Sequence, residues 1–190
     1  MHEPVDLRSD TVTRPSPAMR DVISRADVGD DVFDEDPTVL RLEETAARLT
    51  GKETALFVPS GCMANLIAQL VHVRRGDEVI VGRDSHIVLH EVGSGAAVAG
   101  VQYDIGPERR ITADYVAERI KAATFHEPGT GLVWIENTHN MDGGRTTSVD
   151  ETRRIADVSH GRGVAMHPDG ARVFNAAIAL GVPAAARCGP

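Results

Sequence analysis

The sequence has few cysteines, few aromatic residues and no long apolar run. Only two cysteines occur among its 190 residues, Cys62 and Cys188. They lie far apart, which excludes a disulfide-rich secreted scaffold and favours a reducing, cytoplasmic location. No apolar run approaches the roughly 20 residues that cross a bilayer, and the polar amino terminus has no signal-peptide core. We therefore expect no membrane partner.

The charge balance is acidic. Twenty Lys and Arg residues stand against twenty-eight Asp and Glu residues, a formal net charge of −8. This balance argues against nucleic acid as a partner, although a small anionic ligand needs only a local positive site. With 42% hydrophobic and 25% charged residues, the chain can bury a core, so a disordered chain is excluded.

Short apolar runs alternate with helical patterns along the chain. The runs predict buried strands at residues 55–58, 79–81, 96–101, 132–135 and 163–166. The helical patterns cover residues 37–50, 62–75, 113–123 and 149–160. This alternation predicts an α/β fold with an open, mostly parallel sheet and flanking helices. In such sheets ligands bind beyond the carboxyl ends of the strands.

The first two predicted strands end at residues of possible chemical use. Ser60, Gly61 and Cys62 form a glycine turn that leads into a helix, which suits a phosphate, but an ordinary turn capped by Ser60 explains it equally. His86 follows the second strand, and His90 would share its helical face. A metal ligand, a ring stacked on a flat cofactor and a surface histidine all remain open for His86.

The last two predicted strands also end in polar residues. Residues 136–144 form a dense polar cluster, and Asp169 and Arg172 follow the fifth strand. Pyridoxal phosphate requires an anion cradle, a flat group over its ring and a carboxylate at the ring nitrogen. Residues 60–65, His86 and Asp169 supply these in chain order. Arg172 would then hold a substrate carboxylate, although a structural salt bridge explains it as well.

Several motifs strengthen this interpretation: Asp6–Pro15, Val28–Val32, Glu35–Val39, Pro59–Gly61, Glu136–Asn140 and Asp169–Arg172. Through these motifs, the sequence resembles the low-specificity L-threonine aldolases from residue 6 to about 181. The resemblance implies the large domain of the aspartate-aminotransferase type of fold, which is fold type I. It also implies pyridoxal phosphate as cofactor and retro-aldol cleavage of L-threonine or L-allo-threonine, an amino-acid substrate, to glycine and acetaldehyde.

The resemblance also assigns roles to individual residues. It implies that Ser60, Gly61 and Cys62 bind the phosphate and that His86 stacks on the ring. Asp169 would hold the ring nitrogen, and Arg172 and Ser9 the substrate carboxylate. The catalytic group would comprise His86, His126 and Asp169, with His86 or His126 taking the proton of the substrate hydroxyl. No metal ligand is expected.

The sequence departs from the family pattern at several positions. Cys62 stands where relatives carry threonine, Phe33 and Asp34 replace Tyr-Gly, and Pro168 precedes Asp169. The only lysines are Lys52 and Lys121, and neither is placed like a Schiff-base lysine, which in the family lies beyond the Asp169–Arg172 motif.

We therefore expect residues 1–190 to form part of the cofactor-binding large domain, with an amino-terminal arm over about residues 1–36. The carboxyl-terminal strands and the small domain would be absent, leaving this chain inactive and poorly soluble alone, whereas the complete enzyme would form a dimer or tetramer.

Three other functions remain open. A β-eliminating lyase acting on another amino acid would share the cofactor site. A second alternative is a catalytically inactive fragment. A metal-dependent hydrolase would use a different set of groups: His86, His90, His139, His167 and Asp169.

Overall fold

The computed structural model describes residues 5–187 of the chain. Its sheet has four strands: β1 (Glu78–Val81), β2 (Gln102–Ile105), β3 (Thr130–Glu136) and β4 (Ala165–Asp169). The strands are all parallel and lie in the order β2-β1-β3-β4. The register pairs Glu136 at the end of β3 with Asp169 at the end of β4. The predicted parallel α/β fold is confirmed.

Helices connect and flank these strands. The α-helices are α1 (Pro17–Ser24), α2 (Pro37–Thr50), α3 (Gly61–His72), α4 (His86–Leu89), α5 (Ala113–Arg119), α6 (Val149–His160) and α7 (Val173–Leu180). The short turns are η1 (Asp10–Val12), η2 (Asp31–Phe33), η3 (Gly95–Ala99), η4 (Asn140–Asp142) and η5 (Ala184–Arg187). Among the described residues, no helix is both long enough and apolar enough to cross a membrane.

Alternate residues of the strands face two separate apolar layers. Ile80 and Val133 point to the layer that contains residues of α5 and α6. Val79 and Trp134 point to the other face, where residues of α3 pack. All four side chains are completely buried. This alternation explains why the strand sequences are almost continuously apolar, since both faces of the sheet are covered.

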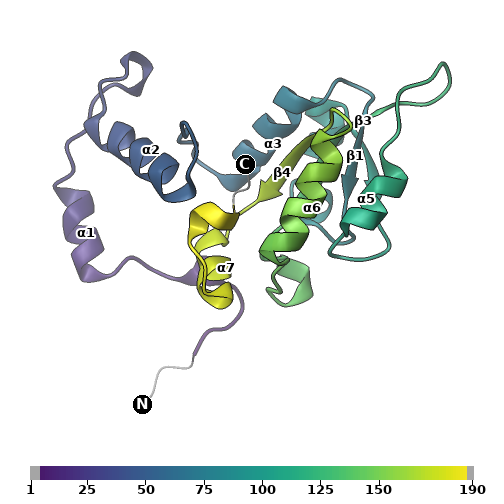
Figure 1. The fold of residues 1–190 in the computed structure, drawn as a ribbon. Helices are drawn as coiled ribbons and strands as arrows, with labels where there is room; N and C mark the ends of the chain where they lie inside the picture. Colours follow the sequence, from purple (N-terminus) through teal and green to yellow (C-terminus); the bar gives the residue numbers. More distant parts are fainter. Residues whose placement is uncertain (1–4, 188–190) are drawn as a thin grey trace.

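The amino-terminal segment stands away from the sheet (Figure 1). Helix α1 has no buried residue, and α2 buries only Ala47. Local signals define the helix ends: the side chain of Asp36 caps α2 just before Pro37, and Gly51 ends it with a φ of 70°. Asp34 replaces the family glycine and has a φ of 56°, a left-handed conformation that aspartate tolerates.

Two predicted strands are wrong. Residues 55–58 are extended but pair with no strand of the described chain, and the N–H of Phe57 donates instead to Glu43 Oε1 at 2.6 Å. Leu56 is 72% exposed, so the expected burial on both faces is also absent. Residues 95–99 form the helical turn η3, and the strand of this region is β2, whose partly polar sequence suits an edge.

Other boundaries differ by smaller amounts. Helix α5 ends at Arg119 rather than residue 123. Strand β4 begins at Ala165, two residues later than expected, and runs to Asp169. It includes Pro168, which lacks an N–H, and lies at the edge of the sheet, where a proline is tolerated.

Candidate active site

A cleft of about 520 Å³ lies where α3 begins and β4 ends. Gly61 and Asp169 both line it, together with Asn65. These positions are far apart in the sequence but meet because the start of α3 lies beside the carboxyl end of β4, where Asn65 on α3 donates a hydrogen bond to Asp169. The two positions on which the cofactor prediction depends therefore share one cavity.

The start of α3 offers donors to an anion. Ser60 caps the helix, and its Oγ accepts the N–H of Met63 at 3.2 Å. The first N–H groups of a helix have no partner within it and carry its positive dipole end. A side chain added at Gly61 would meet no atom within 4 Å, so the space beside this turn is open.

Asp169 is held in a fixed orientation at the end of β4. The residue is 8% exposed. Its Oδ2 accepts a hydrogen bond from Asn65 Nδ2 at 2.9 Å, and its Oδ1 accepts one from the N–H of Ala171 at 3.2 Å. Pro168 pairs in register with Ile135, so the proline leaves Asp169 inside the cleft.

A hydrogen-bonded chain links Asp169 to His86. Asn65 Nδ2 also donates to Glu91 Oε1 at 2.7 Å, and the same oxygen lies 2.8 Å from His86 Nδ1. An ionised carboxylate only accepts hydrogen bonds, so Nδ1 of His86 carries the proton. In the neutral ring, Nε2 is then the nitrogen with the free lone pair.

Glu136 fixes the backbone of the same region. Its Oε2 accepts the N–H of His86 at 2.8 Å, and its Oε1 accepts the N–H of Asn140 at 2.8 Å. The carboxylate therefore ties the start of α4 to the loop after β3. Asn137 exchanges two hydrogen bonds with the backbone of Thr147 in the same loop. The polar cluster after β3 is thus largely a scaffold.

An aromatic pair lies beneath the strand ends. The rings of Trp134 on β3 and His167 on β4 stack with centroids 4.2 Å apart. Burial lowers the pKa of His167 to about 4, against the opposing effect of the Asp169 charge. His167 is therefore a neutral ring at pH 7.

Arg172 is already paired in this structure. Its Nε and Nη2 donate to the two carboxylate oxygens of Asp10 at 2.6 and 2.9 Å. The hydrogen bond from Arg172 lowers the pKa of Asp10. Ser9 instead caps η1 by accepting the N–H of Thr11. A substrate carboxylate would therefore have to replace Asp10 on Arg172.

The structure does not bring His126 to the cleft. It lies in the loop before β3, at the amino end of the strand, whereas the cleft lies at the carboxyl ends. The seven residues of β3 separate these edges by about 20 Å. His126 is therefore not among the residues that line this cleft, and the role that the resemblance gives it stays a prediction.

The ligand set of the metal hydrolase alternative is not assembled. Among residues 5–187, a single group of three potential ligands lies close enough to hold a metal: Cys62, His86 and Glu91. His90 approaches His86, with ring centroids 5.3 Å apart, but joins no such group. His139, His167 and Asp169 are likewise outside it. The structure therefore contradicts that set.

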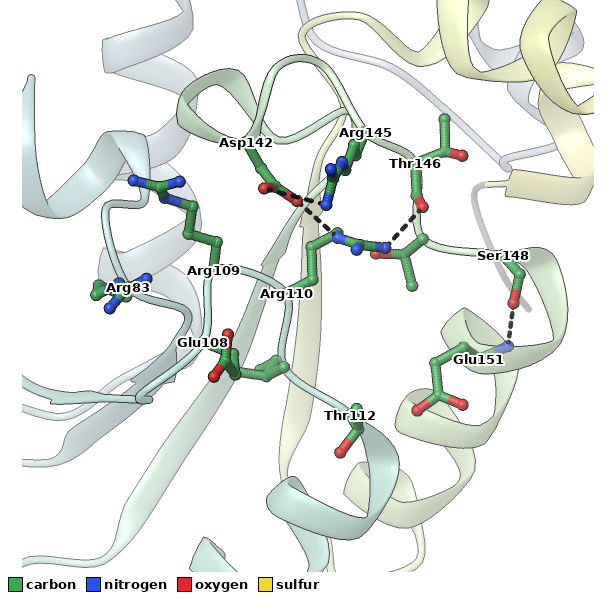
Figure 2. Close-up of a pocket in the computed structure, with 12 residues that line it drawn as sticks. Arg83, Glu108, Arg109, Arg110, Thr112, Asp142, Arg145, Thr146, Ser148 and Glu151 are labelled. Atoms are coloured by element: carbon green, nitrogen blue, oxygen red, sulfur yellow. Dashed lines mark hydrogen bonds and ion pairs between the residues drawn. The ribbon is translucent and has the colours of Figure 1, made fainter.

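A second cavity of about 590 Å³ lies near the starts of α5 and α6. Figure 2 shows Arg110 directed at Asp142 and at the carbonyl of Thr146, with hydrogen bonds of 2.9 and 3.2 Å. Every arginine lining it has an acidic partner: Arg83 and Arg109 pair with Asp84, and Arg110 and Arg145 with Asp142. Glu108 and Glu151 also line the cavity, so four acidic groups balance its four arginines and make it a weaker candidate for an anionic ligand.

The sequence matches the family described as beta-eliminating lyase over residues 6–189. The chain belongs to the beta-eliminating lyase family. Low-specificity L-threonine aldolase 1 of Arabidopsis thaliana is 49% identical over 186 residues, covering 94% of this chain and 52% of that protein. Low specificity L-threonine aldolase of Escherichia coli K12 is 44% identical over 180 residues, covering 93% and 53%.

A solved structure of the threonine aldolase of Leishmania major has the same fold. The match has a TM-score of 0.79 at 21% identity and covers 93% of this chain and 53% of that one. The predicted resemblance and the fold type I architecture are confirmed. This member of the beta-eliminating lyase family spans about half the length of the relatives it matches.

Within this beta-eliminating lyase, sequence reasoning missed the residues that connect the site. Asn65 lies in the predicted anion cradle, residues 60–65, and Glu91 lies shortly after His86. Their contacts with Asp169 and His86 depend on the tertiary fold. Asp10 lies within the Asp6–Pro15 motif and is the ion-pair partner of Arg172. A buried acid five residues after His86 was the available signal for Glu91.

Proposed function

We propose that this chain forms the cofactor-binding part of a pyridoxal-phosphate enzyme that cleaves L-threonine or L-allo-threonine to glycine and acetaldehyde. The observation that carries the proposal is the shared cleft of Gly61 and Asp169, with His86 joined to it through Asn65 and Glu91. In the same proposal, residues 1–190 are part of a large domain with an arm over about residues 1–36.

The residues present fit the cofactor. The N–H groups at the start of α3, at Gly61 and Cys62, suit its phosphate. The buried carboxylate of Asp169 would keep the pyridine nitrogen protonated. When bound, pyridoxal phosphate supplies an electron sink for breaking a bond at the α-carbon of an amino acid. The exposed thiol of Cys62 is a weaker donor than the family threonine, so the backbone groups would carry most of the phosphate binding.

Two side chains would act on the substrate. Arg172 would bind the substrate carboxylate in two-point fashion after release of Asp10. His86 is the histidine available to take the hydroxyl proton, at Nε2, while Nδ1 remains bonded to Glu91. Lys121 is paired with Glu78 at the amino end of β1, at 2.9 Å, and has no role at the cleft. The resemblance places the Schiff-base lysine outside this chain.

Cofactor binding can be measured through Trp134, the single tryptophan of the sequence. It is buried and stacks on His167, two residues before Asp169. Adding pyridoxal phosphate should quench its fluorescence. Asp169→Asn should weaken binding by about tenfold to 100-fold, since a hydrogen bond to a charged group is lost. Asp150→Asn is a matched control, because its side chain is 90% exposed on α6. Equal affinity in the two variants would reject the role of Asp169.

Activity is to be tested with the complete enzyme that contains this segment. Formation of glycine and acetaldehyde from L-threonine or L-allo-threonine would support the aldolase, and Asp169→Ala should nearly abolish it. Ammonia and pyruvate, or release of an aromatic side chain, would instead indicate β-elimination on another amino acid. An oligomeric assembly, a cytoplasmic location and inactivity of residues 1–190 alone stay predictions.

A further inference from the structure

Three potential metal ligands of different chemistry converge beside the cleft. Cys62 lies in the first turn of α3, His86 begins α4, and Glu91 follows α4. One ligand atom from each lies within 4.8 Å of the others. Cys62 is exposed, His86 is half-buried and Glu91 is buried. The group therefore has a buried anionic end and an end that an ion can reach from solvent.

Glu91 gives an independent reason to expect a cation. Its Oε1 accepts hydrogen bonds from Asn65 and lies 2.8 Å from His86 Nδ1. Its Oε2 is buried and has no hydrogen-bond partner among the described residues. Removing a carboxylate oxygen from water is unfavourable unless a donor or a cation satisfies it. The free oxygen belongs to the same side chain that faces the imidazole.

We propose that Cys62, His86 and Glu91 form a binding site for one divalent cation of the zinc type. Thiolate, imidazole and carboxylate are all zinc ligands, at about 2.0–2.3 Å, whereas magnesium and calcium prefer oxygen alone. Such bond lengths require ligand atoms about 3.3–3.8 Å apart in a tetrahedron. The 2.8 Å between His86 Nδ1 and Glu91 Oε1 and the 4.8 Å limit of the group bracket this spacing, so binding requires only small rotations of these side chains.

The proton balance of binding follows from the observed contacts. The ion takes the place of the proton on His86 Nδ1 and is bound by the Glu91 carboxylate, including the Oε2 that lacks a hydrogen-bond partner within residues 5–187, and the neutral imidazole keeps that proton on Nε2. Cys62 binds as a thiolate and releases its thiol proton. Binding of one ion therefore releases about one proton, that of the Cys62 thiol.

Cobalt is the probe for this site, because a thiolate bound to Co²⁺ absorbs in the near ultraviolet and zinc is silent. Co²⁺ added to the purified, reduced protein should produce this absorption at one ion per chain, and Zn²⁺ should remove it. Cys62→Ser, a small change at an exposed position, should abolish the absorption and weaken binding by more than about tenfold. Glu91→Gln should weaken binding while keeping the absorption.

The matched control is Cys188→Ser, which removes the other cysteine of the sequence. It should bind Co²⁺ as the unaltered protein does. Loss of the absorption in Cys188→Ser, or its persistence in Cys62→Ser, would overturn the site. Calorimetry in buffers of different ionisation enthalpy should give about one proton released per ion in the unaltered protein, and none in Cys62→Ser.

One consequence rests on the proposed function, because Cys62 and His86 also belong to the proposed cofactor site. Pyridoxal phosphate should therefore lower the apparent affinity for Co²⁺. Unchanged affinity, in a protein whose Trp134 fluorescence shows bound cofactor, would reject the overlap of the two sites while the variant data still decide the metal site. Failure of the fluorescence titration alone would count against the proposed function instead.

Discussion

The sheet and the amino-terminal segment, residues 5–58, cover their apolar residues to very different extents. Ile80 on β1 is completely buried, and so is Val133 on β3. In the amino-terminal segment, Ile23 is 65% exposed and Phe33 is 71% exposed. Both regions have well-defined helices with side-chain caps. Local sequence signals thus suffice to form a helix, whereas burial depends on which surface lies opposite it.

The largest expected effect comes from one substitution made in both regions. Ile80→Ala should lower the free energy of unfolding by about 3 kcal/mol, since it removes a fully buried side chain and leaves a cavity. Ile23→Ala, on the exposed face of α1, should change it by less than about 0.5 kcal/mol. Urea unfolding measures both values. Equal losses would show that α1 is covered in solution.

A smaller effect should appear on lowering the pH, through His167. Its pKa is about 4 in the native protein and near 6.5 in an exposed state. Between these values the unfolded chain binds the extra proton. The free energy of unfolding should therefore fall as the pH drops from 6.5 to 4, by at most about 3 kcal/mol.

His167→Gln lacks this titration. As the pH falls through that window, the unaltered protein should lose stability relative to this variant. Urea unfolding at several pH values measures the difference. A difference that stays constant with pH would contradict the buried, neutral state of His167.

The smallest effect concerns the contact between the two regions. Asp10→Asn removes the ion pair with Arg172, so residues before α2 should be cut faster in limited proteolysis. Asp6→Asn is the control, since Asp6 pairs only with its near neighbour Arg8 among the ion pairs of residues 5–187. Unfolding of the sheet should be unchanged in both variants. Identical cleavage rates would show that this ion pair does not hold the segment.

The sequence predicted those features that depend on neighbouring residues. Helix α2 spans residues 37–50 and α6 spans residues 149–160, both as expected. The strand predicted at residues 55–58 is absent because a strand requires a partner strand, and apolar content does not indicate whether one is present. The strand β2 was displaced because, at an edge, it carries polar residues.

The site was predictable only as far as topology is predictable. Gly61 and Asp169 were expected together, and they line one cleft, but the strand predicted before Gly61 is absent, so the alignment of parallel strand ends accounts for the position of Asp169 alone. The role of His126 stays a prediction, because the resemblance gave it no position relative to the sheet. Glu91 and Asn65 were missed because their contacts join residues 26 and 104 positions apart, distances over which no local pattern operates.

The amide group of Asn65 has two hydrogens, and both are committed, one to Asp169 and one to Glu91. The Asn65 Nδ2 group therefore donates a hydrogen bond to each of two neighbouring carboxylates, those of Asp169 and Glu91. An aspartate there would put three carboxylates side by side. With a leucine, Asp169 would keep only the N–H of Ala171 and Glu91 only His86 as a donor, so the link between the two acids would be lost while each remained partly satisfied.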